Sequence, residues 1–139
     1  MAKEKFTAEV LTPEGSVFKD EVEMVSTRTT VGSIGILAKH QPLLGMLEPT
    51  ELRLYKGESD IVRFAQGEGY VQVSRDGVLL LVQDAVDPAS LDVADLRDRL
   101  RRAEEAERES EEDSEERRQA VRDRKRWEAF IRLAEEGAA

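Results

Sequence analysis

The chain is organised around the stretch VGSIGILAKHQPLLGML, residues 31–47. Its glycines interrupt an apolar run that contains the only histidine of the chain, His40. Glycines spaced in this way are typical of turns and loops. Short runs with β-strand character surround the stretch and continue to about Val86, and a highly charged helical pattern follows. We therefore expect a loop held in a β domain, with a separate helical part after it.

The composition excludes several kinds of site and partner. The 139 residues carry a net charge of −9, which argues against nucleic acid as a partner. The absence of cysteine excludes disulfides and thiolate metal sites, and one histidine cannot form a histidine-rich metal site. The N-terminus lacks the apolar segment of a signal peptide, and no run of about 20 apolar residues is present. We expect a soluble, intracellular chain without a transmembrane segment, which can still dock onto a membrane complex.

The first part of the chain has the pattern of short strands. Near the N-terminus Phe6, Ala8 and Val10 alternate with polar residues, which is the period of a half-buried strand. Turn signals separate further runs of this kind at residues 12–15, 56–60 and 75–77. Asp-Gly within the last of them is a strong signal for a tight hairpin.

The strand pattern predicts the fold class. The run Val78–Val82 is apolar at every position, so we place it inside a sheet that is covered on both faces. Several short strands at regular spacing, with no helix between them, are typical of an antiparallel sandwich or barrel. The prediction is a fold in two parts: a β-sandwich or barrel over residues 1–86 and an antiparallel two-helix hairpin over residues 87–139.

The second part packs 12 basic and 17 acidic side chains into residues 87–139. This density of charge is too high for a core of its own, so we expect a solvated helical element. Asp92 is the expected N-cap of a first helix with a narrow apolar stripe. Asp113 with Glu116 has the spacing of a capping box for a second helix, and residues 135–139 are expected to fray.

His40 is the obvious candidate for catalysis, but no serine or cysteine nucleophile, carboxylate cluster or metal-ligand spacing surrounds it in the sequence. A general base needs partners within hydrogen-bond reach. We therefore interpret His40 as a structural or contact residue, and a small hydrolase that uses it is the weakest alternative. The segment Gly32–Gly35 lacks the lysine and the following helix of a phosphate-binding loop.

Two features of the predicted second helix allow more than one interpretation. Its arginines suit a phosphate or an acidic partner, and they equally suit a solvated helix with internal ion pairs. Trp127, Phe130 and Ile131 lie largely on one side, which favours docking onto the sandwich or a partner over packing within the hairpin. A long helical hairpin on a β-sandwich, with no catalytic constellation, indicates an adaptor or regulatory subunit and not an enzyme.

Three parts of the chain carry motifs: TPEGSVF at residues 12–18, GIL at residues 35–37 with HQPLL at residues 40–44, and the segment 78–85. In this order they resemble the (S/T)PEG-x-(V/L)F motif, the GIL-P-GH-A-PL segment and the VTVLA-x-x-A strand of the epsilon subunit of F-type ATP synthases. The resemblance covers essentially the whole chain, including the change to a two-helix tail.

This resemblance implies a non-catalytic subunit of the F1 sector of a proton-translocating ATP synthase, located in the rotor at the foot of the central stalk. The implied partners are the gamma subunit, the ring of c subunits and, through the C-terminal helices, the alpha and beta subunits. The subunit would couple proton transport to ATP synthesis, and its helical tail would inhibit ATP hydrolysis. It would be a peripheral membrane protein on the cytoplasmic face of a bacterial cell membrane. The residues expected to contact partners are Ser33, Ile34, Gly35, Ile36, Leu37, His40, Pro42, Leu43, Trp127, Phe130 and Ile131.

The chain departs from the family's pattern at its contact motif and at its nucleotide motif. Ser33 stands where an acidic residue is common, and Ala38-Lys39 replaces the usual Pro-Gly before the histidine. The nucleotide-sensing pattern (I/L)-D-x-x-R-A begins correctly at Leu91 but has Asp95 and Leu96 in place of arginine and alanine. We therefore expect no cofactor. The residues that could contact a regulatory ATP in a shifted geometry are Asp92, Arg97, Arg99, Arg122 and Arg126.

The alternative from another class is a stand-alone β-sandwich binding module with a coiled-coil oligomerisation tail. A heptad tail would give a stable homodimer, whereas a stalk subunit would be a monomer before it meets gamma. Size-exclusion chromatography with light scattering separates these two hypotheses.

Overall fold

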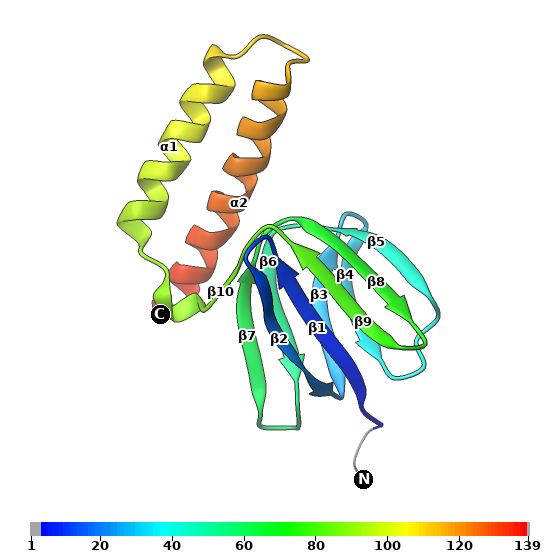
Figure 1. The fold of residues 1–139 in the computed structure, drawn as a ribbon. Coiled ribbons are helices and arrows are strands. Elements are labelled where there is room, and N and C mark those ends of the chain that lie inside the picture. Colours follow the sequence, from blue (N-terminus) through cyan, green and yellow to red (C-terminus); the bar gives the residue numbers. More distant parts are fainter. Residues whose placement is uncertain (1–3, 139) are drawn as a thin grey trace. The chain divides into compact units, whose positions relative to one another are not determined.

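The computed structural model describes residues 4–138, and the chain divides into two compact units, Met1–Val86 and Asp87–Ala139. The first unit consists of strands and the second of helices (Figure 1). The predicted fold class, a β-sandwich or barrel followed by a helical hairpin, is confirmed. No helix within the described residues is long and apolar enough to span a membrane.

The first unit is a ten-stranded sheet that curls into a sandwich. Its strands are β1 (Phe6–Thr12), β2 (Gly15–Val22), β3 (Met24–Thr29), β4 (Gly32–Leu37), β5 (Leu43–Leu47), β6 (Thr50–Tyr55), β7 (Ile61–Gln66), β8 (Gly69–Ser74), β9 (Gly77–Val82) and β10 (Ala85–Val86). The order is β10-β7-β6-β3-β5-β8-β9-β1-β2, with β4 paired to β3 off this path. Among the described strands β1 and β9 run parallel and the other pairs are antiparallel, so the unit is mostly but not wholly antiparallel.

The core of the sandwich follows the alternation of apolar residues. In β1 the side chains of Ala8 and Val10 are completely buried, as the period of two predicts. The same phase continues through the other strands, and the largest completely buried aliphatic side chains are Val10, Val22, Val25, Ile36, Leu52, Leu54, Val71 and Leu80. Polar side chains are also buried in this unit: the hydroxyl of Thr27 donates to Oε1 of Gln66 at 2.6 Å, and Gln66 Nε2 donates to the carbonyl of Glu48 at 2.9 Å.

The expectation that residues 31–47 form a loop is wrong, because most of the stretch folds as β4 and β5. Its glycines have separate roles. Gly32 closes the β3–β4 turn with φ +134°, a conformation that suits glycine, whereas Gly35 lies inside β4 opposite Ser26. Glycine spacing alone did not distinguish a turn from a strand interior.

The expectation that the run 78–82 is covered on both faces is also wrong. Val78, Leu80 and Val82 are buried, but Leu79 is only partly buried and Leu81 is 44% exposed. Strand β9 lies between β8 and β1, so its backbone hydrogen bonds are satisfied on both edges while one face stays in solvent. A continuous apolar run therefore marks, in this sheet, a strand with an apolar outer face.

The second unit holds a short 3₁₀ turn, η1 (Pro88–Ser90), and two helices, α1 (Val93–Glu109) and α2 (Glu115–Ala138). The predicted cap of α1 is confirmed, since the carboxylate of Asp92 accepts hydrogen bonds from the backbone N–H groups of residues 94 and 95. The predicted cap of α2 is one residue too early. The hydroxyl of Ser114 accepts from the backbone N–H of Arg117 at 3.1 Å, and Asp113 precedes it with φ +62°.

Helix α2 extends through Ala138, so the predicted fraying from Glu135 is wrong for residues 135–138. Ala139 lies outside the described residues. The two helices pack against each other as an antiparallel hairpin, as the sequence predicted.

Candidate partner-binding surfaces

The predicted contact residues of the first unit lie on β4, on the β4–β5 turn and at the start of β5. Ser33, Gly35 and Leu37 are exposed, and Ile34 is partly buried. Ile36 is completely buried in the core of the sandwich, so its side chain is part of the scaffold and is not available to a partner. Exposed and buried side chains therefore alternate along this stretch, as in a strand, and they do not form one continuous exposed loop.

The ends of β4 carry two different turns. At the β3–β4 turn the side chain of Val31 is 96% exposed. The hydroxyl of Thr29 donates to the carbonyl of Gly32 at 3.0 Å and accepts from the backbone N–H of Val31 at 3.2 Å, which fixes this turn. Ser33 follows it directly. A fully exposed valine at the tip of a well-ordered turn is a residue that the sequence analysis missed.

At the β4–β5 turn, Lys39 adopts the left-handed conformation with φ +62°. Glycine is usual at this position in the family that the chain resembles. Lysine in this conformation has backbone strain, and glycine would have none. The Lys39 ammonium lies 3.5 Å from a Glu4 carboxylate oxygen, but both side chains are mostly exposed, so the pair contributes little. The strain is thus not offset by a strong local contact of the side chain.

His40 makes contacts that fit a structural role. Its backbone N–H donates to the carbonyl of Leu37 at 3.2 Å, and its Nδ1 lies 2.8 Å from the carbonyl of Gln41. Because a carbonyl can only accept, Nδ1 carries the proton in this geometry. Within residues 4–138 no group of three or more His, Cys, Asp or Glu side chains is placed to hold a metal ion.

Leu37, His40 and Pro42 line an open groove of about 640 Å³. The first residues of β1 and the β8–β9 turn line it as well. The apolar lining comes from Phe6, Leu37, Pro42, Val73 and Val78, and the charged lining from Glu4, Lys5, Glu21, Lys39, Arg75 and Asp76. With three acidic and three basic groups, the groove does not select a partner by its sign of charge.

An apolar surface lies on the outer face of β5, β8 and β9, which are neighbours in the sheet (Figure 1). We call it the outer face; its residues are Leu44, Met46, Tyr70 and Leu81, which are 75%, 56%, 52% and 44% exposed. Met46 pairs with Tyr70, and Tyr70 pairs with Leu81, so three of them form one row across the strands. Contiguous exposed apolar surface of this kind marks an interaction site.

The sequence contains a signal for the outer face in two of its strands. Strand β5, LLGML, and strand β9, GVLLLV, have apolar residues in both phases of the alternation. The apolar residues on one face of each strand fill the core, and those on the other face need another surface to cover them. The prediction for β9 was cover on both faces and that for β5 was a loop, whereas in both strands the second phase is at least partly exposed.

In the second unit the aromatic residues contact their own hairpin. The rings of Trp127 and Phe130 meet edge to face with centroids 5.9 Å apart. The guanidinium of Arg99, on α1, lies 5.2 Å from the indole centroid, and that of Arg126 lies 5.0 Å from it. Phe130 is nearly completely buried, and Ile131 is partly buried. For Trp127 the alternative of packing within the hairpin accounts for these contacts.

The residues considered for ATP are each engaged by other groups of the hairpin. Asp92 caps α1, and the guanidinium groups of the four arginines contact carboxylates. The pairs are Arg97 with Glu135 at 2.8 Å, Arg99 with Asp95 at 2.9 Å, Arg122 with Glu115 at 2.9 Å and Arg126 with Asp123 at 3.3 Å. These contacts favour the interpretation of a solvated helix with internal ion pairs over that of a preformed phosphate site.

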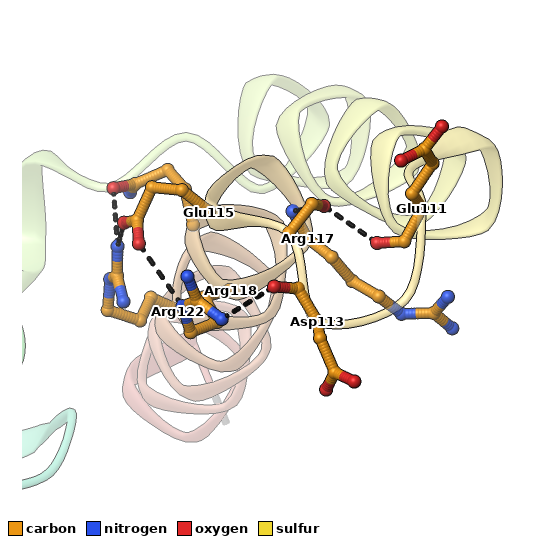
Figure 2. Close-up of polar contacts among 8 residues, drawn as sticks. Glu111, Asp113, Glu115, Arg117, Arg118 and Arg122 are labelled. Carbon is orange, nitrogen blue, oxygen red and sulfur yellow. Dashed lines mark hydrogen bonds and ion pairs between the residues drawn. The ribbon is translucent and has the colours of Figure 1, made fainter.

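A larger network surrounds the turn between the helices (Figure 2). Hydrogen bonds from Arg122 and Arg118 to the carboxylate of Glu115 lower the pKa of Glu115 below its ordinary value. Further along α2, hydrogen bonds to Glu107 and then to Glu128 raise the pKa of Arg124. Most of these paired charges lie within α2, and the pair of Arg124 with Glu107 joins α2 to α1.

Comparison with known proteins places this chain in a family. The model of the ATP synthase delta/epsilon chain β-sandwich domain matches residues 5–88. The ATP synthase epsilon chain of Alkalihalophilus pseudofirmus is 42% identical over 96 residues, which are 69% of this chain and 68% of the relative. That of Halalkalibacterium halodurans is 41% identical over 96 residues, 68% of this chain and 71% of the relative. The chain belongs to the ATP synthase delta/epsilon family.

The resemblance to the epsilon subunit is thereby confirmed. Epsilon chains are a non-catalytic part of the F-type ATP synthase and belong to its central stalk, so the prediction that this chain is not itself an enzyme is confirmed at the level of the family. The family model ends at residue 88, so it covers the sandwich and not the hairpin.

Solved structures share the fold of this epsilon-family chain. A chain in the cryo-EM structure of the Euglena gracilis mitochondrial ATP synthase, OSCP/F1/c-ring, matches with a TM-score of 0.74 at 19% identity, over 99% of this chain and 84% of that one. A chain in the central stalk and c-ring of the Tetrahymena thermophila mitochondrial ATP synthase matches with a TM-score of 0.57 at 18% identity, over the full length of both. At these identities the matches concern the fold.

Proposed function

We propose that this epsilon-family chain is a rotor component that links the gamma subunit to the ring of c subunits and restrains ATP hydrolysis through its helical hairpin. The observation that carries the proposal is the outer face. A chain that worked alone would hold Leu44, Met46, Tyr70 and Leu81 in water at a cost, whereas a permanent subunit buries them on assembly. Membership of the family identifies the assembly.

We assign the outer face to the gamma subunit. Covering four apolar side chains that are roughly half exposed would contribute on the order of 4 kcal/mol, with Tyr70 at the centre of the row. Strand β5 begins directly after the turn that lines the groove, so His40, Pro42 and Leu43 extend the same contact. A side chain of gamma would enter the groove between this turn and the β8–β9 turn.

We assign the β3–β4 turn to the ring of c subunits. The tip residue Val31 is almost fully exposed, and Ser33 beside it occupies the position at which an acidic residue is common in the family. Serine can accept and donate hydrogen bonds but brings no charge, so this contact would rely on Val31 and on neutral hydrogen bonds more than on an ion pair. With these two contacts the subunit transmits rotation driven by proton transport to the sector that makes ATP.

The proposed location is the cytoplasmic face of a bacterial cell membrane, where the chain would be held peripherally through the c ring. The bacterial origin of the two epsilon-chain relatives supports a bacterial host. The absence of a membrane-spanning helix within residues 4–138 is compatible with this attachment through partners.

The hairpin is the proposed inhibitory element, and it would contact the alpha and beta subunits when extended. Its surface is rich in charge, and Trp127 and Ile131 are partly exposed. We propose further that it works without a cofactor, because the candidate arginines already contact carboxylates. Isothermal titration of the full chain with Mg-ATP should give no binding heat up to about millimolar nucleotide, and a saturable isotherm would reject this part of the proposal.

The assignment of the two surfaces is tested with two reciprocal variants. Tyr70→Asp places a charge at the centre of the outer face, and Val31→Asp places the same charge at the β3–β4 turn. Both positions are more than half exposed, so both variants should fold. In pull-downs with purified gamma and with detergent-solubilised c ring, Tyr70→Asp should lose gamma alone, and Val31→Asp should retain gamma and weaken capture of the ring. The opposite result, or equal loss in both, would reject the assignment.

Inhibition is tested by removing residues 88–139. A reconstituted complex with the truncated subunit should assemble and hydrolyse ATP faster than the complex with the full chain. Unchanged hydrolysis would reject the inhibitory role and leave the rotor role in place. Light scattering on the free full chain should give a monomer, whereas a stable dimer would favour the alternative of an oligomerisation tail.

A further inference from the structure

The contacts between α1 and α2 are unusually polar. The guanidinium of Arg124, on α2, lies between two carboxylates: its Nε is 2.7 Å from Glu107 of α1, and its Nη1 is 2.8 Å from Glu128 of its own helix. The side chains of Arg124 and Glu107 are 29% and 23% exposed, so this pair is less solvated than a second described interhelical pair, Arg97 with Glu135, at 65% and 51%. Partial burial makes the Arg124–Glu107 pair the stronger of the two.

The apolar seam of the hairpin is thin by comparison. The buried apolar residues are Leu96 and Ala103 on α1, and Ala120, Ala129 and Phe130 on α2. Those in the half next to the turn are the two alanines Ala103 and Ala120. An alanine methyl contributes much less to burial than a leucine or a phenylalanine side chain. The half of the hairpin next to the turn, where Glu107 and Arg124 meet, therefore depends on the ion pair more than on apolar packing.

The turn between the helices acts against the closed hairpin. Residues 104–116 carry nine acidic side chains and one basic one, so nearly the whole net charge of −9 is concentrated in this segment. The end of α1 is acidic, where the helix dipole favours cations. Asp113 holds φ +62° in the turn. Folding the turn brings like charges together and strains the backbone, and both terms favour separation of the helices.

Side chains from the start of α2 hold this turn in place (Figure 2). The guanidinium of Arg118 donates to the carbonyl of Asp113 at 2.9 Å, and the hydroxyl of Ser114 donates to the carbonyl of Glu111 at 2.7 Å. These hydrogen bonds fix the turn locally but do not join α1 to α2 along their length. The interhelical contact closest to the acidic turn among the described ion pairs is Arg124 with Glu107.

We propose that Arg124 is a latch that keeps the helical hairpin closed by bridging Glu107 of α1 and Glu128 of α2. When the bridge to Glu107 breaks, Arg124 keeps its partner on α2, so the open state does not leave an unpaired guanidinium. Repulsion in segment 104–116 then favours separation of the helices. The latch concerns the hairpin of the free chain, and only its effect on ATP hydrolysis rests on the proposed inhibitory function.

The test compares two Arg→Gln variants. One removes an ion pair between the helices, and the other removes an ion pair within one helix. Arg124→Gln removes the interhelical bridge, and Arg102→Gln removes the same charge from a pair within α1, with Asp98. Arg124→Lys keeps the charge but loses the forked geometry that reaches two carboxylates. The chain has no cysteine, so spin labels can be placed at two introduced cysteines, Ala94→Cys and Glu136→Cys.

Those two labels lie on adjacent helices when the hairpin is closed and about 60 Å apart when α2 continues the line of α1. Electron-electron double resonance on the full chain should show an open-to-closed ratio raised about fivefold by Arg124→Gln, less by Arg124→Lys, and unchanged by Arg102→Gln. Circular dichroism should confirm equal helix content in all variants. Equal distance distributions for Arg124→Gln and Arg102→Gln would overturn the latch, as would loss of helix without a long distance.

Hydrolysis by the reconstituted complex separates this inference from the proposed function. If the tail inhibits when extended, Arg124→Gln should lower ATPase activity below that of the complex with the natural chain, opposite to the truncation. A long distance in the free chain together with unchanged hydrolysis would support the latch and reject the inhibitory role. An unchanged distance would reject the latch whatever the ATPase result.

Discussion

Gly69 has the least room for a side chain among the described glycines, and its replacement by alanine is a sharp test of how the outer face is placed. It begins β8 directly before Tyr70, opposite Val82 of β9. A methyl group at Gly69 would lie 1.9 Å from the carbonyl oxygen of Leu81 and 2.8 Å from Cα of Val82. Both atoms belong to the backbone of the neighbouring strand, so no side-chain rotation can relieve the overlap.

The structure sets the size of the expected effect. A carbon and a carbonyl oxygen normally stay at least about 3.2 Å apart, so the β8 and β9 backbones would have to separate by roughly 1.3 Å. Overpacking in a close-packed core costs about 1–3 kcal/mol, and a backbone-to-backbone overlap belongs at the upper end. A loss of about 3 kcal/mol is a large share of the 5–15 kcal/mol that stabilises a typical domain.

Amide hydrogen exchange of the full chain measures this loss strand by strand. Protection of the β8 and β9 amides should fall about 100-fold in Gly69→Ala, because each 1.4 kcal/mol is a factor of ten. Gly35→Ala is the matched control, since a methyl group there would meet only Sδ of Met24 at 3.7 Å. Its protection should be unchanged or slightly raised. If the two variants exchange at similar rates, the overlap at Gly69 does not control the pairing of β8 with β9.

Three further changes test individual contacts. Lys39→Gly should raise the free energy of unfolding by about 1 kcal/mol in urea denaturation, because glycine accepts φ +62° without strain; a loss of stability would contradict this. Gln66→Leu should lower it by about 2 kcal/mol, since the buried hydroxyl of Thr27 loses its acceptor, and a neutral result would mean that water replaces the amide. Hydrogen bonds led by that from Arg122 lower the pKa of Glu115, so its stabilising contribution is complete above the ordinary value of 4.5 and is lost as pH falls through the lowered folded value. An NMR titration of the Glu115 carboxyl should give a midpoint below 4.5 that rises in Arg122→Gln, and equal midpoints would contradict this.

Local rules predicted the elements whose signals are local. The alternation around Ala8 and Val10 gave β1, Asp76-Gly77 gave the β8–β9 hairpin, and Asp92 gave the start of α1. The cap of α2 was misplaced by one residue because Asp113 and Ser114 are both good caps, and the choice depends on the backbone of the turn.

Features that depend on distant parts of the chain were not predictable in this way. The parallel pairing of β1 with β9 joins segments about 70 residues apart and leaves no trace in either segment alone. The same holds for the partner surfaces. Burial of Ile36 and exposure of Leu44 follow from the direction in which β4 and β5 face, which the motif at residues 35–44 does not show.

The two units carry surfaces of different physical kind, and the difference fits two different kinds of contact. The outer face is apolar and rigid, because its side chains stand on hydrogen-bonded strands whose opposite faces form the core. Burying it costs little conformational entropy and is hard to reverse, which suits the proposed permanent contact with gamma. The hairpin instead pairs Arg124 with Glu107, and the buried apolar side chains in its half next to the turn are those of Ala103 and Ala120. When such an ion pair breaks, water replaces the lost partner, so the net change in free energy is small. New contacts of the extended helices that contribute a few kcal/mol are therefore enough to shift the equilibrium between the closed and the open hairpin. A hairpin with leucines along its whole interhelical contact would be too stable to open. A charged outer face would bind its partner too weakly to stay bound during rotation. The distribution of apolar and charged residues between the units therefore fits the proposal that the contact of the outer face persists and that the contact within the hairpin changes.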